Sequence, residues 1–183
     1  MCRAMVKNKK ISAQDLQQSF ESALLIMNSP LWGAYIPVPE EVASFYKEKT
    51  IARFIAQINN RLTLHCAIMP GGNQTFFILM NKANVKALKI DIGMPLTVIL
   101  SPDYSKYGMP LGEELEVLLQ EDTLFEQYFE KLTPGKQRNL IYLVNKAKSS
   151  EIRLRTAIVV AAHLEANNGQ LDFKMLNEAL KQK

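Results

Sequence analysis

The 183-residue chain has few of the residues that build metal sites or disulfide frameworks, with only two cysteines and two histidines. His65 and Cys66 are adjacent, so on a strand their side chains would point to opposite faces and could not bind one ion. His163 lies inside an apolar helical segment, and no CxxC or HxxxH spacing occurs. We therefore expect structural histidines, reduced cysteines, and no metal or other cofactor.

Motifs of nucleophilic catalysis are also missing. The chain has neither a GxSxG elbow nor a Cys-His-Asn order, and two histidines leave few general bases near neutral pH. Residues 70–73 (PGGN) lack the Lys-Ser/Thr of a phosphate loop and are interpreted as a hairpin turn. An enzyme would have to use residues outside these motifs, so the absences favour a non-enzymatic protein and leave the question open.

Long hydrophobic runs are absent as well. No stretch reaches the roughly 18 apolar residues of a membrane-spanning helix, and residues 1–7 lack the apolar core of a secretory signal. We expect a cytoplasmic protein with no membrane span. A composition of 48% apolar and 22% charged residues is typical of globular proteins. The length allows one sizeable core or two small ones.

Residues 17–103 show mainly the hydrophobic pattern of β-strands. Six or seven short β-rich runs alternate with turn signals, at residues 28–30, 59–61 and 70–73. Short helices interrupt the pattern near residues 39–42 and 84–88. Strands with one apolar face usually curl into a barrel or sandwich, because closure removes exposed edges. We predict a small closed or split β-barrel here, preceded by a loose basic arm over residues 1–16.

From residue 113 onwards the pattern has the 3.6-residue period of helices. Five helices with short joints are predicted, over residues 113–120, 122–131, 134–148, 151–166 and 172–181. Thr133 before Pro134 indicates an N-cap hydroxyl with Pro at the first helical position. Gly169 and Asp172 mark a stop and a new start. The predicted class is α+β, with a barrel, a linker over residues 104–112 and a C-terminal helical bundle region over residues 113–183.

Charge is distributed unevenly over the helical region. Residues 131–155 carry seven basic side chains and one acid, a local charge of +6, whereas the whole chain has +4. Residues 113–130 carry seven acids and no base. Antiparallel packing of the acidic helices on the basic ones would pair these charges. Arg153 and Arg155 lie at the start of an almost wholly apolar helix, which must be central to a bundle or covered by a partner. An unpaired arginine in that core would cost several kcal/mol of stability.

Several motifs resemble two bacterial families. One set is similar to the family of unknown function numbered 1905, in residues 32–42, 67–72, 76–82 and 92–98. A second set is similar to the helical segment of the YdeI/OmpD-associated, bacteriocin-protection-like family, in residues 129–138 and 146–155. The resemblance implies a small split β-barrel followed by a helical tail. It implies no reaction, because none is established for the family, and Ile152 departs from its usual Thr.

Three functional hypotheses follow. The first is a non-enzymatic cytoplasmic binding or interaction protein of unknown protein or small-molecule partner, in stress or bacteriocin protection. Its candidate residues lie on the barrel or its turns: Trp32, Tyr35, Arg53, Arg61 and Phe76. Local packing and solvated charge are the simpler explanations for these residues.

The second hypothesis is nonspecific nucleic-acid binding by the basic arm and the basic helices, because cations that neutralise phosphates release counterions. Its candidate residues are Arg3, Lys7, Lys9 and Lys10 of the arm and Lys136, Arg138, Lys146, Lys148, Arg153 and Arg155 of the helices. A solvated helix face is the simpler explanation for this group. The third hypothesis is a small-molecule pocket in the barrel. The sequence determines neither the ligand nor the oligomeric state.

Overall fold

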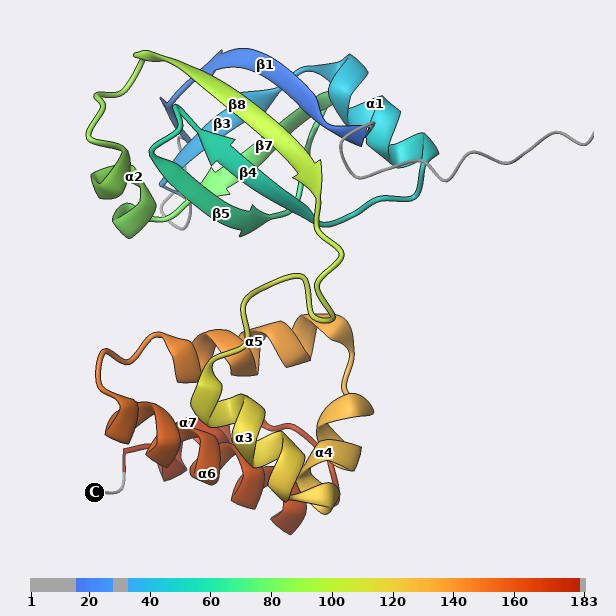
Figure 1. Cartoon of the computed structure of the whole chain (residues 1–183), viewed down its shortest axis with the longest axis vertical. Helices are drawn as coiled ribbons and strands as arrows, with labels where there is room; N and C mark the ends of the chain where they lie inside the picture. Colours follow the sequence, from blue (N-terminus) through green and yellow to red (C-terminus); the bar gives the residue numbers. More distant parts are fainter. Residues whose placement is uncertain (1–15, 28–32, 182–183) are drawn as a thin grey trace, which may run out of the picture. The chain divides into compact units, whose positions relative to one another are not determined.

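A computed structural model describes residues 16–27 and 33–181 of the chain (Figure 1). The chain divides into two compact units, Met1–Tyr104 and Ser105–Lys183. The predicted basic arm lies outside the described residues except for Leu16, and so does Trp32.

The N-terminal unit contains two antiparallel four-stranded sheets and two helices. The first sheet has the order β1-β8-β4-β5, formed by Gln18–Ala23, Pro95–Pro102, Phe54–Ile58 and Leu62–Cys66. The second has the order β2-β3-β7-β6, formed by Leu25–Ile26, Ala34–Val38, Thr75–Met80 and Met69–Gly72. The helices are α1 (Glu40–Glu48) and α2 (Lys82–Leu88).

The predicted barrel is not confirmed, because the two sheets do not close on each other within the described part of the chain. The chain passes from one sheet to the other four times, between β1 and β2, β3 and β4, β5 and β6, and β7 and β8. Only one residue separates β1 from β2 and two separate β5 from β6, so the chain bends sharply into the other sheet at these two crossings. A second correction concerns residues 70–73: most of this segment belongs to β6, and the turn falls at Asn73 and Gln74, where φ is positive.

Alternation along the strands builds the core of this unit. In β8, Leu96, Val98 and Leu100 are buried while the residues between them are more exposed, as expected when successive side chains point to opposite faces. Tyr46 of α1 completes the core. Its hydroxyl oxygen lies 2.9 Å and 2.7 Å from the carbonyl oxygens of Leu16 and Leu100, which anchors α1 to the first sheet.

The C-terminal unit is helical, and all five predicted helices are confirmed. They are α3 (Glu113–Glu121), α4 (Thr123–Glu130), α5 (Pro134–Asn145), α6 (Ser150–Ala166) and α7 (Phe173–Ala179). Asp172 caps α7 by accepting hydrogen bonds from the backbone N–H groups of Lys174 and Met175. Thr133 is the N-cap residue of α5, but its hydroxyl makes no capping bond, so that detail was wrong.

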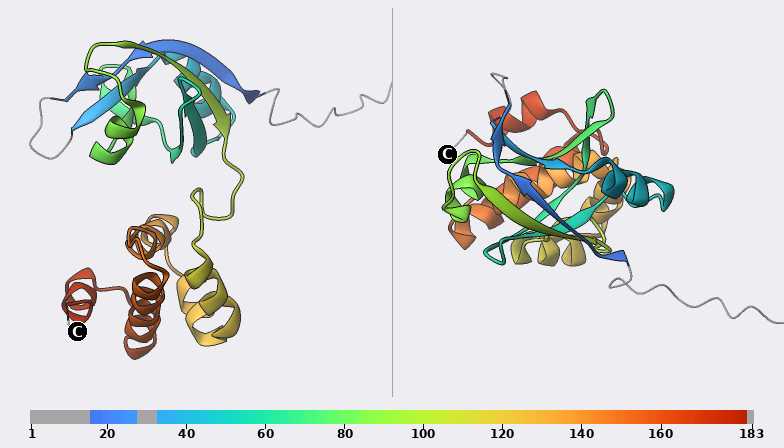
Figure 2. Two further views of the ribbon diagram at one scale, coloured as in Figure 1. Left: turned by 60° about the vertical axis from the view of Figure 1, so that its left-hand side comes forward. Right: turned by 90° about the horizontal axis from the view of Figure 1, so that it is seen from above.

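Helix α6 is central to this unit and packs against the other four helices (Figure 2). Phe125 and Phe129 of α4 are fully buried against it in the core, together with Leu140, Val160 and Leu164. The expected antiparallel packing was wrong for α3 and α6. Glu114 contacts Arg153 near the starts of both helices, and Asp122 contacts Glu165 near their ends, so α3 and α6 run in the same direction.

Candidate ligand-binding site

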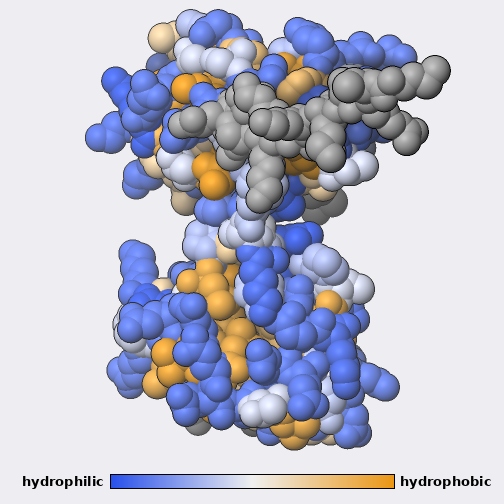
Figure 3. Space-filling view, turned by 45° about the vertical axis from the view of Figure 1, so that its right-hand side comes forward, coloured by the Kyte–Doolittle hydropathy of each residue, from blue (hydrophilic) through white to orange (hydrophobic). Residues whose placement is uncertain are grey.

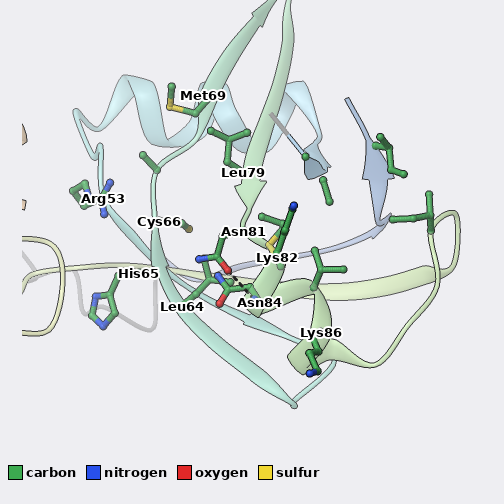
Figure 4. Close-up of a pocket in the computed structure, with 17 residues that line it drawn as sticks. Arg53, Leu64, His65, Cys66, Met69, Leu79, Asn81, Lys82, Asn84 and Lys86 are labelled. Atoms are coloured by element: carbon green, nitrogen blue, oxygen red, sulfur yellow. Dashed lines mark hydrogen bonds between the residues drawn. The ribbon is translucent and has the colours of Figure 1, made fainter. Parts of the chain in front are cut away.

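A cavity of about 900 Å³ in the N-terminal unit lies beside the edge strand β5 (Figure 4). Strand β5 contributes Leu64 and Cys66, strand β7 contributes Leu79 and Met80, and α2 borders the cavity. Strand β5 pairs only with β4, and the next strand, β6, belongs to the other sheet. The cavity therefore occupies the place where the two sheets fail to close.

Apolar side chains make up most of the cavity wall. They come from both sheets and from the segments around α2: Ile26, Leu64, Met69, Leu79, Met80, Val85 and Ile92. Leu64 and Cys66 face Ala56 and Phe54 of β4 in register, and both β4 residues are buried. Strand alternation therefore directs this row of β5 inwards.

The charged side chains that line the cavity are those of arginine and lysine. Arg53 precedes β4, and Lys82 and Lys86 lie one turn apart on α2, where the spacing of four residues places them on one face. No aspartate or glutamate is among the lining residues. Asn81 caps α2 by accepting a hydrogen bond of 2.8 Å from the backbone N–H of Asn84, and both asparagines also line the cavity. The cavity thus combines an apolar wall with positive charge.

The thiol of Cys66 faces the cavity but is not an activated nucleophile. Burial raises its pKa to about 12, and the opposing influence of Arg53 is smaller. A thiol reacts as the thiolate, which is scarce at neutral pH when the pKa is this high. The arrangement favours binding over covalent chemistry at this position.

The neighbouring His65 points to the opposite face of β5 from Cys66, as expected for adjacent strand residues, and contacts an acid. Its Nδ1 lies 2.7 Å from Oδ2 of Asp103, whose side chain is only 1% exposed. The backbone N–H of Asp103 also donates to the carbonyl of Arg53, so the contact ties the end of β8 to β4 and β5. Figure 4 shows the side chains of His65 and Cys66 pointing apart. No group of three metal-ligating residues occurs in the part of the chain that the structure describes.

The sequence-based candidates in this unit are dispersed. Only Arg53 lines the large cavity. Phe76 lines a second cavity of about 410 Å³ near α1, and Tyr35 packs edge-to-face on Phe77. Arg61 is exposed in the turn after β4. Trp32 lies outside the described residues. Sequence reasoning missed Lys82 and Lys86, although two lysines four residues apart at the start of a helix were a readable signal.

Two basic candidates of the helical unit, Arg153 and Arg138, form hydrogen bonds with other groups of their own chain. Nε and Nη2 of Arg153 donate to the two carboxylate oxygens of Glu114 at 2.8 and 2.7 Å, and its Nη1 donates to backbone carbonyls. Nη1 of Arg138 donates to the carbonyl of Tyr107 at 3.4 Å. Lys136 and Arg155 are exposed on α5 and α6. The predicted pairing of Arg153 with residues 113–130 is confirmed.

Comparisons with known proteins find one family match in each part of the chain. Residues 20–100 match the family described as Domain of unknown function (DUF1905). Residues 109–167 match the family described as Bacteriocin-protection, YdeI or OmpD-Associated. No curated protein and no solved structure matches the chain significantly. Among the described residues, no helix has the length and apolar character needed to cross a membrane.

Proposed function

We propose that this chain, which matches the DUF1905 family over residues 20–100 and the YdeI/OmpD-associated family over residues 109–167, is a non-enzymatic binding protein for a small amphipathic anion. The observation that carries the proposal is the cavity of about 900 Å³ beside β5, whose ordinarily charged lining residues are all basic. Its volume lies within the range of about 300 to 1,000 Å³ that is usual for small-molecule sites.

The cavity suggests how such a ligand binds. Apolar wall residues such as Leu64 and Leu79 would cover the hydrophobic body of the ligand, and burial of apolar surface contributes about 25 cal/mol per Å². Lys82 and Lys86 on α2 would hold an anionic headgroup, because a carboxylate, sulfonate or phosphate accepts hydrogen bonds from ammonium groups. Burial would thus supply most of the affinity, and charge would supply orientation.

Two observations support a binding role over catalysis. The Cys66 thiol has a raised pKa, and His65 is engaged by Asp103 and points away from Cys66. The proposal retains the expected cytoplasmic location. It also retains a role in stress or bacteriocin protection, which rests on the family description alone.

Nucleic-acid binding receives less support. Arg153 forms a two-point contact with Glu114, and a guanidinium held in this way is not available to a phosphate. Acids also accompany the basic helices, since α3 and α4 carry Glu113, Glu121 and Glu126 on their exposed sides. We therefore place the ligand site in the N-terminal unit.

Two fluorescent probes with the same aromatic framework test the proposal. Anilinonaphthalene sulfonate carries an anionic group, and N-phenylnaphthylamine lacks it. We expect Lys82→Gln/Lys86→Gln to weaken sulfonate binding about tenfold, since two exposed charge contacts contribute up to about 1 kcal/mol each. Binding of the neutral probe should change less than about twofold. Fluorescence titration measures both dissociation constants.

Two controls complete this experiment. Lys136→Gln/Lys146→Gln makes the same change of charge on exposed lysines of α5 and its C-cap and should leave both probes unaffected. Met69→Gln adds a polar group to the cavity wall with little change in size, so it should weaken both probes. Failure of the wild-type protein to bind the sulfonate probe, or an equal loss of both probes in the α2 variant, would refute the proposed site.

A further inference from the structure

An apolar groove runs along the surface between α3 and α6. Three large hydrophobic side chains remain half exposed there: Val117 of α3 (50%), Leu154 (45%) and Ile158 (51%) of α6. A depression of about 300 Å³ extends along α3 beside the start of α6, lined by Glu113, Glu114, Val117, Leu118, Glu121, Ser150 and Leu154. Hydrophobic side chains also reach the surface of the helical unit in Figure 3. The sequence predicts that α6 is central to a bundle or covered by a partner; α6 is central, and its Leu154 and Ile158 remain exposed.

Helical spacing aligns these residues in two rows. On α6, Leu154 and Ile158 are four residues apart and lie on one stripe. On α3, Val117 lies four residues after Glu113 and four before Glu121, so acids flank it along one face. Because α3 and α6 pack side by side in the same direction, the two rows border one groove.

Acids stand at both ends of the groove. At the start, Glu114 is engaged by Arg153, while Glu113 beside it is exposed. At the far end, Glu121 is followed by Asp122, which forms a carboxylate–carboxylate contact with Glu165 of α6. This contact raises the pKa of Glu165, because one of the two groups favours keeping a proton. A basic side chain placed at this end would relieve the repulsion.

We infer that the groove between α3 and α6 is a docking site for a basic amphipathic helix of a partner protein. Glu113 and Glu121 are eight residues apart, about 12 Å along the helix axis. The partner would therefore present two basic residues seven or eight positions apart, with apolar residues on the same face between them. The acidic ends disfavour nucleic acid and anionic lipid, which carry the wrong charge.

The test uses a synthetic helical peptide of about 14 residues that carries lysine, leucine, leucine and lysine at positions i, i+3, i+4 and i+7, with alanine and glutamine elsewhere. Amide chemical shifts of the isotope-labelled full chain report binding. We expect saturable shifts confined to α3 and α6, with a dissociation constant below about 1 mM. A peptide of the same composition with these four residues dispersed around the helix should produce no saturable shift.

Matched variants locate the contact. Ile158→Ser and Glu121→Gln should each weaken peptide binding by at least about threefold, since each removes one apolar or charged contact. Ile152→Ser changes an equally exposed residue on another side of α6, and Glu178→Gln changes an exposed acid of α7; neither should alter binding.

Three outcomes would overturn the inference. The first is equal binding of the dispersed peptide, and the second is an equal loss of affinity in the two control variants. The third comes from sedimentation of the chain alone. Self-association that Ile158→Ser abolishes would assign the groove to a second copy of this chain and would refute docking of a basic partner helix. The probe titrations at the N-terminal unit are independent of all three results.

Discussion

The two units differ in their net charge and in the ion pairs that their basic side chains form. Residues 1–104 contain eleven basic and seven acidic residues, whereas residues 105–183 contain eleven of each. The whole net charge of +4 therefore belongs to the N-terminal unit, although residues 131–155 of the helical unit have a local charge of +6. In the helical unit, Arg153 pairs with Glu114 and Lys106 with Glu130. In the β unit, Lys82 and Lys86 line a cavity that no acid borders.

This comparison shows that charge density along a sequence does not identify a binding surface. Arg153 and Lys82 both belong to clusters of basic residues, but within the described part of the chain only Arg153 forms an ion pair with a carboxylate. The difference arises from which helices pack together. Acids of α3 lie beside the start of α6, whereas the described residues that line the cavity beside α2 include no aspartate or glutamate.

Core truncation tests most strongly whether the units are separate. Phe54 and Phe129 are both almost wholly buried, one in each core. We expect Phe54→Ala and Phe129→Ala each to cost about 3 to 5 kcal/mol of unfolding free energy, because each leaves a cavity. Chemical denaturation followed by amide NMR should show each change in one unit only. Equal destabilisation of both units by one substitution would show that they unfold together.

A glycine substitution should act on the helical unit with a smaller effect. Gly169 follows α6 with φ of 80°, and an added Cβ would lie 2.6 Å from Cδ1 of Tyr128. Gly169→Ala should cost about 2 kcal/mol, from left-handed backbone strain and the clash. Gly135 in the first turn of α5 has open space around it. Gly135→Ala should therefore stabilise the same unit slightly, by about 0.5 kcal/mol, in urea titrations.

Tyr46 provides a pH-dependent test of the β unit. Removal of its buried hydroxyl by Tyr46→Phe should cost about 1 kcal/mol. Burial raises the pKa of Tyr46 to about 12 from its usual 10.0, so its contribution is complete below pH 10 and is lost as pH rises towards 12. Unfolding measured across this range should show less alkaline destabilisation in the variant. An identical pH profile for variant and wild type would contradict this assignment.

The smallest effect is expected at Glu114 in the helical unit. Hydrogen bonds from Arg153 lower the pKa of Glu114 to about 2 from 4.5. Its contribution to stability is therefore present above pH 4.5 and is lost as pH falls towards 2. Glu114→Gln should flatten the acid limb of the unfolding curve of this unit. Glu116→Gln, an exposed acid on the same helix, should leave that limb unchanged.

Much of the local structure was readable from sequence, because helix starts and turns depend on a few neighbouring residues. Pro134 marked the start of α5, Asp172 capped α7, and the turn at residues 59–61 uses Asn59 and Asn60 with positive φ, as the asparagines indicated. Strand β6 was missed because its Pro-Gly-Gly sequence has low strand propensity, and pairing with β7 decides its conformation.

The sequence by itself determined the α+β class, the five C-terminal helices and the two family resemblances, since these depend on local periodicity and motifs. Tertiary structure alone decided that the sheets stay unclosed at β5, that α3 and α6 run in the same direction, and that Arg153 meets Glu114. It also decided that Lys82 and Lys86 line a cavity. These properties depend on which distant segments pack together, and pairwise packing is not encoded in the spacing of residues along one segment.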